Sequence, residues 1–424
     1  MSTVTRARTI RHRAALRAVR QPRLIALAAV TGPGILAGLS DDDPAGITTY
    51  SILGADFGYR LLWVLLLSTV ALVVFHELGA RMGCVTGRGL ATLIRERYGH
   101  RAAISMAGVL LAANIGTTCA EFAGVAAASE LAGISRYASV PVAATLVSVL
   151  VVRGGFKRVE HVLLLLSTVF VAYFASGVLA HPRWGEAARG LVVPSLPFER
   201  HALLVATATV GTTLAPWGLA FIQSYAVDKH LLPRDLALER VDVITGAVMT
   251  GVIGFFIVIA CAATLHVQHH SVDDAADAAS ALKPLAGSLA STLFGVGLLG
   301  AALLAAAILP LSTAYSVSEA FGRRARIEAP VREEPLFYGT YAVVVVVGSA
   351  VVLAPGAPLV PILFLTQAIN AVLLLPLLGF MALLTRDRTL LGEHAAGSAW
   401  TAVTLALALL IATAIFVLGI LAVR

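Results

Sequence analysis

The stretch GLSDDDPAG, residues 38–46, places three consecutive carboxylates inside an apolar segment that runs from Leu24 to Gly54. A charged side chain within a bilayer costs about 2.5 kcal/mol or more, so such residues usually mark an ion pathway or a ligand site. Pro44 directly follows the third carboxylate, and Gly46 lies two residues further on. The combination predicts that a membrane-spanning helix is interrupted here and that the interruption carries the function.

The composition of the whole chain is typical of a membrane protein. Of the 424 residues, 58% are hydrophobic and 13% are charged, whereas a soluble domain carries about 25% charged residues. Apolar runs of about 20 residues, long enough to cross the hydrocarbon core, recur along the chain. We expect an all-α integral membrane protein with eleven spans, at residues 24–54, 60–81, 101–132, 137–152, 159–181, 201–227, 242–265, 288–318, 336–354, 358–384 and 397–423.

The positions of the basic residues predict the orientation. With a cytoplasmic N-terminus, 24 of the 31 Lys and Arg residues fall in the N-terminal arm and the cytoplasmic loops, as the positive-inside rule requires. We therefore expect a multi-pass protein of the plasma membrane, the inner membrane of the cell, with its N-terminus inside and its C-terminus outside. The net charge of +7 then reports topology and indicates no nucleic-acid partner.

A second interruption lies in the middle of the sixth span, at Ala215-Pro216-Trp217-Gly218, and it repeats the x-Pro-x-Gly pattern of Asp43-Pro44-Ala45-Gly46. Proline removes a backbone donor and glycine permits unwound dihedrals, so Pro44, Pro216 and Gly218 are expected helix breaks. Two breaks five spans apart are typical of transporters built from inverted repeats. We expect repeats at residues 24–200 and 201–384, a basic arm at 1–23 and an appended span at 385–424.

The quoted segments resemble the Nramp family of divalent metal transporters. GPGILAGLSDDDPAGITTYSILGADFGYRLLW, residues 32–63, is similar to the first-span signature of that family, and GARMGCVTGRGLATLIRERYG, residues 79–99, resembles its following loop. TTLAPWGLAF, residues 212–221, falls where the family carries Met-Pro-His. The resemblance implies a LeuT-like fold of ten spans in two inverted repeats with an eleventh appended.

The resemblance also implies a metal site between the two breaks. In the family, an Asp and an Asn of the first break, a Met of the second and two backbone carbonyls hold a transition metal. The matching positions here are Asp43, Gly46, Ala215 and the carbonyls of Ser40 and Thr212, with Trp217 at the position of a family His. Only the carboxylate and the carbonyls remain as donors, although Asp43 could equally cap the half-helix that it precedes.

Loss of the thioether removes the soft donor that favours Mn²⁺ or Fe²⁺ over hard cations. Mg²⁺ is commonly held by one or two carboxylates while it keeps several waters. The residues at the two breaks therefore favour alternating-access transport of Mg²⁺, with Mn²⁺ as a further substrate. Their pattern resembles that of the Nramp-related magnesium transporters. A proton-coupled Mn²⁺ or Fe²⁺ importer on the same fold is the alternative.

Further polar residues could line a path for protons or cations. The family relay in the third span pairs an Asp with a Glu three residues on, and the matching positions are Thr118 and Glu121. A relay with most titratable groups missing predicts weak or absent proton coupling. Gln367 and Asn370 share one helix face in the tenth span, where the family uses an amide near the metal; bonds between helices are the alternative. Asp41 and Asp42 could line a vestibule or be solvated turn residues.

Other functions find little support in the sequence. An Asp-rich motif could bind Mg²⁺-diphosphate in a prenyltransferase-type enzyme, but no second such motif appears, and HExxH, GxSxG and P-loop motifs are absent as well. We expect no enzymatic activity and no cofactor, only a transported cation and the bilayer as partners. The chain indicates no oligomer, and a monomer is compatible with it. A loop with His266, His269, His270, Asp273, Asp274 and Asp277 could gather metal or simply be solvated.

Overall fold

The computed structural model describes residues 42–153, 171–197, 199–323 and 330–423, and this part of the chain consists of helices and connecting loops without strands. The helices at the expected spans are α4 (Pro44–Phe57), α5 (Leu62–Thr86), α7 (His100–Leu131), α8 (Arg136–Val152), α10 (Val171–Leu179), α12 (Arg200–Thr213), α13 (Pro216–Asp228), α14 (Leu236–Thr264), α17 (Ala290–Ala320), α18 (Pro335–Val352), α19 (Leu359–Thr385) and α21 (Ser398–Val423). Short helices in the connections are α6 (Leu90–Tyr98), α11 (Trp184–Val192), α15 (Ala275–Ser280), α16 (Lys283–Ala286) and α20 (Arg388–Leu391).

The expected spans agree with these helices to within a few residues. Eight helical segments of the described chain, with α12 and α13 taken together, are long and apolar enough to cross a membrane, and α8 is a shorter apolar helix. α4 and α10 are described only in part of the expected first and fifth spans. The largest difference is at α14, which begins six residues before the expected span because its first turns are polar and extend beyond the apolar stretch.

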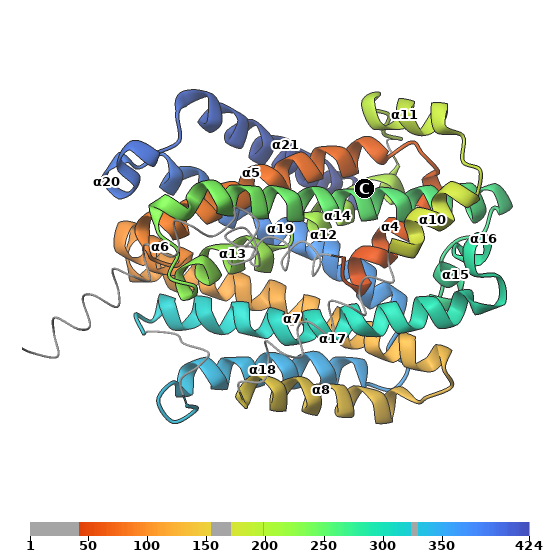
Figure 1. Ribbon diagram of the computed structural model, residues 1–424, viewed down its shortest axis with the longest axis horizontal. Helices are drawn as coiled ribbons and strands as arrows, with labels where there is room; N and C mark the ends of the chain where they lie inside the picture. The colour runs from red at the N-terminus through yellow and green to blue at the C-terminus, as the bar shows by residue number, and fades with distance from the viewer. Residues whose placement is uncertain (1–41, 154–170, 198, 324–329, 424) are drawn as a thin grey trace, which may run out of the picture.

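The helices form layers around a central group (Figure 1). α8 and α18 lie along one edge, α7 and α17 form the next layer, and α5, α14 and α21 lie on the opposite side. α4, α12, α13 and α19 occupy the space between these layers. α7 packs most extensively against α17, and α21 is the long helix with the smallest buried share. The apolar outer side chains therefore face the surroundings, as expected of a protein in lipid.

Glycines allow the central helices to approach closely. A Cβ atom at Gly211 in α12 would collide with the carbonyl of Gln367 in α19, and one at Gly348 in α18 would meet the backbone and side chain of Thr118 in α7. Between helices in lipid there is no hydrophobic driving force, and association depends on close van der Waals packing. Small residues at the crossings allow that packing. The polar side chains discussed below are therefore fixed by tight packing of their helices.

Candidate metal site

The first break is built by the residues that the sequence singled out. Asp43 has an extended conformation (ψ 170°), Pro44 is the first residue of α4, and the Asp43 Oδ1 atom accepts a hydrogen bond of 2.6 Å from the Gly46 N–H. Asp43 therefore caps the half-helix, and its charge lies at the positive end of the helix dipole. Asp43 is only 3% exposed, so its carboxylate lies inside the protein, where it could also bind a cation.

The second break leaves one backbone carbonyl without its helical partner. α12 ends at Thr213, Ala215 is not helical (φ −54°, ψ 127°), and α13 begins at Pro216. Pro216 has no N–H to donate to the carbonyl of Thr212 four residues earlier. In the described chain no other backbone or side-chain donor reaches that carbonyl. The same four-residue spacing separates Ser40 from Pro44, but Ser40 lies outside the described residues.

A second carboxylate lies beside the first break. Glu121 in α7 is fully buried, and its carboxyl group neighbours that of Asp43. One turn further along α7, Gly124 packs directly against the ring of Pro44, so α7 and the start of α4 touch at this level. Two neighbouring buried carboxylates repel one another unless a proton or a cation lies close to them. The pair is therefore suited to a positively charged ligand.

The other members of the expected proton path are placed differently. Thr118 is buried, and its Cβ and Cγ2 atoms contact Gly348 of α18, a helix that has no Asp, Glu, His, Lys or Arg. Asp42 is 2% exposed, so it is not a solvated turn residue. Asp41 lies outside the described residues.

The two amides in α19 bond to each other next to the second break, and Asn370 also bonds to α7. Gln367 Oε1 accepts a 3.1 Å hydrogen bond from Asn370 Nδ2, which also donates to Thr117 Oγ1 of α7 at 2.8 Å. The Gln367 backbone packs against Gly211, one residue before Thr212. Both amides are thus used for bonds between side chains, and Gln367 also lies beside the end of α12 that carries the unpaired carbonyl.

Trp217 and Ala215 contribute to an apolar wall. They share a buried cluster with Phe221 of α13 and with α17 side chains Leu304, Ala305, Ile308 and Leu309. The Trp217 indole N–H has no hydrogen-bond partner among the described residues, whereas its backbone carbonyl accepts a 3.0 Å bond from Ser312. Gly218 donates its N–H to the Ala215 carbonyl at 3.1 Å and so opens α13. Neither side chain offers a metal-ligating atom.

A cavity of about 430 Å³ opens at the C-terminal end of α7. It is lined by Ala127, Glu130 and Leu131 of α7, by Arg136, by residues 273–276 and by residues 357–361 at the start of α19. Ala127 lies six residues, about 9 Å along the helix, beyond Glu121. The cavity therefore lies at the end of the molecule that the charge distribution predicts to be outside.

The His and Asp residues of the loop after α14 bond within the protein. His266 Nδ1 lies 2.8 Å from the Ala55 carbonyl, His270 pairs with Asp277 at 2.7 Å, and Asp274 caps α15. Within the described residues no group of three or more potential ligands could hold a metal ion. Hydrogen bonds within the protein therefore account for these His and Asp side chains without a metal ion.

Sequence reasoning did not find the contacts that fix the site. Tyr50 of α4 bonds to Thr213 at the end of α12, and Gly124 makes room for Pro44. The spacing of seven residues between Asp43 and Tyr50 places both on one helix face, which is the available signal. Nothing in the sequence alone distinguishes Gly124 from the other glycines of α7.

The comparisons with known structures agree with the fold. A manganese transporter of Eremococcus coleocola superposes with a TM-score of 0.74 at 20% identity, over 94% of this chain and 87% of that one. A nucleobase-cation-symport-1 family transporter, which has the LeuT fold, gives a TM-score of 0.56 at 14% identity. The chain thus has an all-helical, LeuT-like fold, and within the described residues its sixth span is broken between α12 and α13.

The comparisons of sequence identify the family. The divalent metal cation transporter MntH of Acidiphilium cryptum is 32% identical over 63% of this chain and 64% of its own length. The protein of the same name from Burkholderia ambifaria is 30% identical over 77% of this chain and 75% of its own length. The family model described as "Nramp: Natural resistance-associated macrophage protein-like" matches residues 34–421. The chain belongs to the Nramp family.

Proposed function

We propose that this protein carries divalent metal cations across the membrane by alternating access. The observation that carries the proposal is the pairing of the two breaks: Asp43 presents a buried carboxylate at one, and Thr212 presents a carbonyl without a donor at the other. Broken helices that face each other offer cations both kinds of oxygen. The relatives named above are transporters, not enzymes, so the prenyltransferase-type alternative has no support.

The first candidate ion is Mn²⁺. The similar solved structure is that of a manganese transporter, and the similar sequences are named divalent metal cation transporters. These names support the importer of Mn²⁺ or Fe²⁺ better than the Mg²⁺ preference that the sequence suggests. Carboxylate and carbonyl oxygens are ligands that Mn²⁺ accepts without a sulfur donor.

The second candidate ion is Mg²⁺, and a specific observation favours it. Gly46, Ala215 and Trp217 contribute no ligating side-chain atom, so every donor at the breaks is an oxygen. Small side chains at Gly46 and Ala215 leave volume for the water molecules that Mg²⁺ retains.

Proton coupling is proposed to be weak. Thr118 cannot titrate, and α18 beside it has no Asp, Glu, His, Lys or Arg, so protons have no continuous relay from Glu121 in that direction. Uptake would then follow the membrane potential, which contributes about 2.3 kcal/mol per charge per 100 mV. We further propose the plasma membrane as the location, with the N-terminus inside and the C-terminus outside.

The test is cation uptake into proteoliposomes that contain a Mg²⁺ or Mn²⁺ indicator and a pH probe. We expect saturable entry of a divalent cation with little acidification, and Asp43→Ala should abolish it. Asp56→Asn is the matched control, since Asp56 lies at the outer end of the same helix and pairs with His201 at 2.8 Å. Equal uptake by Asp43→Ala and by the unmodified protein would refute the site.

A second variant separates the two ions. Gly46→Asn, Ala215→Met and Trp217→His together restore the ligand types of the family, and we expect them to shift preference towards Mn²⁺. If the unmodified protein already takes up Mn²⁺ in preference to Mg²⁺, the argument from donor softness is wrong while the transport function stands.

A further inference from the structure

The half-helix α13 has two sides that differ in how they contact their neighbours. On one side it packs against α5 with almost no space between the backbones. A Cβ atom at Gly79 would lie 3.4 Å from the Leu219 carbonyl oxygen, and one at Gly83 would lie 2.8 Å from the Gln223 carbonyl oxygen and 3.0 Å from Ala226 Cβ. Such interdigitated packing holds two helices as one rigid unit.

On the other side, α13 is held to α17 by separate hydrogen bonds. Ser312 donates to the Trp217 carbonyl at 3.0 Å, and Ser224 donates to Glu319 Oε1 at 3.1 Å. Both pairs are 95 residues apart in the sequence, and they lie two helical turns from each other. α13 and α17 therefore run parallel and in register. Their contact combines the apolar cluster that Trp217 and Phe221 share with α17 and these hydrogen bonds, which can break and re-form.

Glu319 connects this contact to a third helix. Its carboxylate lies against Gly89, with the Oε2 atom buried, and faces the backbone N–H groups of Ala91 and Thr92 at the start of α6. The N-cap residue of α6 is Gly89, which provides no side chain. A carboxylate stabilises the positive end of a helix. One side chain thus joins α17 to both α13 and α6.

A further bond closes the same end of the molecule. Gln223 is fully buried, and its Nε2 atom donates to the Arg88 carbonyl at 2.9 Å in the loop before α6. By contrast, the cavity of about 430 Å³ lies beyond Ala127, at the opposite end. The described part of the chain is therefore bonded shut along α13 at the end that the basic residues predict to be cytoplasmic.

We propose that the α13–α17 contact, with Glu319 as its hub, is the inner gate of the transporter, and that α13 opens it by turning at Leu214–Ala215 while remaining attached to α5. The non-helical residues at this point supply the hinge, because no helical hydrogen bond crosses it to Pro216. Loss of the Ser224 and Glu319 bonds should shift the population towards the open form. The proposal concerns conformation, so it stands or falls separately from the choice of ion.

The test uses a cysteine placed on the contact face of α17. Ser316 is 3% exposed and lies between Ser312 and Glu319 on the helix, so Ser316→Cys reports whether this face is covered. The native Cys84, Cys119 and Cys261 are all buried and serve as internal controls. Maleimide modification of the purified full chain in detergent, quantified for each cysteine by mass spectrometry, gives four rates in one experiment.

We expect slow modification at position 316 in the single variant. Addition of Ser224→Ala, which removes one hydrogen bond worth about 1 kcal/mol, should raise that rate about fivefold, and addition of Glu319→Gln should raise it further. Ser318→Ala is the matched control, because this α17 hydroxyl is buried and has no partner among the described residues. It should leave the rate unchanged.

Two results would overturn the gate. The first is an unchanged rate at position 316 in the Ser224→Ala background, which retains Glu319 and loses a single hydroxyl. The second is an equal rise at Cys84, which packs against Ala226 on the α5 side of α13. Such a rise would show that α13 leaves α5 or that the whole protein loosens.

Discussion

The hydroxyl of Tyr50 in α4 lies 2.9 Å from Thr213 Oγ1 at the end of α12, so these two helices are hydrogen-bonded to each other inside the protein. Thr213 Oγ1 donates its own proton to the Thr209 carbonyl at 2.8 Å, so Tyr50 is the donor in this pair. The Tyr50 ring packs on Gly254 of α14, where an added Cβ would lie 2.9 Å from the ring. Tyr50 therefore fixes the end of α12, next to the unpaired carbonyl of Thr212.

Tyr50→Phe should weaken cation binding without unfolding the protein. The variant keeps the packed ring and loses the buried hydrogen bond to Thr213, about 1 kcal/mol, so we expect the KM for uptake to rise about fivefold with little change in kcat. Tyr341→Phe is the control, since this buried hydroxyl bonds to the Val147 carbonyl at 3.4 Å, between α18 and α8. An equal KM in both variants would contradict a positioning role for Tyr50.

Gly124→Ala should disturb the site through Pro44. The added methyl group would collide with the proline ring, and either α7 or the start of α4 with Asp43 must move. We expect a destabilisation of about 2 kcal/mol, as for other overpacked cores, together with a loss of cation uptake. Gly108→Ala in the same helix meets no atom within 4 Å and should have little effect on either measurement. Normal uptake by Gly124→Ala would show that α7 does not fix Asp43.

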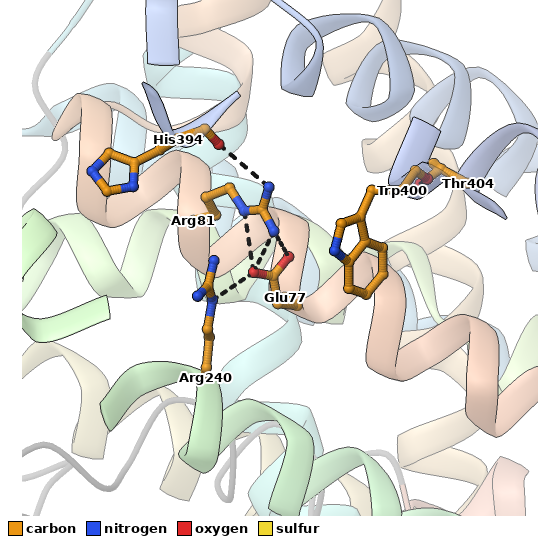
Figure 2. A network of polar contacts seen from close by, with 6 residues as sticks. All are labelled: Glu77, Arg81, Arg240, His394, Trp400 and Thr404. Atoms are coloured by element: carbon orange, nitrogen blue, oxygen red, sulfur yellow. Dashed lines mark hydrogen bonds and ion pairs between the residues drawn. The ribbon is translucent and has the colours of Figure 1, made fainter. Parts of the chain in front are cut away.

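Glu77→Gln should lower the thermal stability of the whole protein. Figure 2 shows the Glu77 carboxylate between Arg81 and Arg240, with Arg81 also reaching the His394 carbonyl before α21. Both side chains of the Glu77–Arg81 pair are almost fully buried, and Arg81 Nη2 lies 2.7 Å from Glu77 Oε1 and 2.8 Å from Oε2. Neutralising the acid therefore leaves the Arg81 guanidinium without its charge partner. We expect a loss of about 3 kcal/mol.

The control for Glu77 is Glu393→Gln, whose side chain is 91% exposed. Surface ion pairs contribute little, so the melting temperature of this variant should stay within a degree or two of the parent. Thermal unfolding of both variants in the same detergent checks the prediction. Equal melting temperatures would mean that the ion pair contributes no net stability.

The spans could be predicted from the sequence because lipid requires long apolar helices. Where the structure describes them, the helices begin and end within about six residues of the expected bounds. The second break was predictable for a similar reason: Pro216 cannot donate to Thr212, whatever the tertiary structure. The orientation of side chains was not predictable at this level. Trp217 faces α17, and Thr118 faces Gly348, because of how neighbouring helices pack. The loop after α14 also shows this limit, since its metal-ligand types bond to one another.

The last prediction concerns that loop and its pH dependence. Partial burial raises the pKa of Asp277, but hydrogen bonds from His270 at 2.7 Å and from the N–H groups of Asp273 and Asp274 outweigh it, so the pKa lies below its ordinary value of 3.8. A carboxyl with a lowered pKa stabilises the folded loop above its unfolded pKa, and this contribution disappears as pH falls through the folded value. Hydrogen exchange of residues 270–280, corrected for intrinsic rates, should therefore show protection that is constant near neutral pH and is lost only below the ordinary pKa. Asp277→Asn should reduce protection at every pH above the pKa of Asp277, whereas Asp273→Asn, which keeps the backbone donor, should not. Equal protection in both variants near neutral pH would mean that Asp277 does not order the loop.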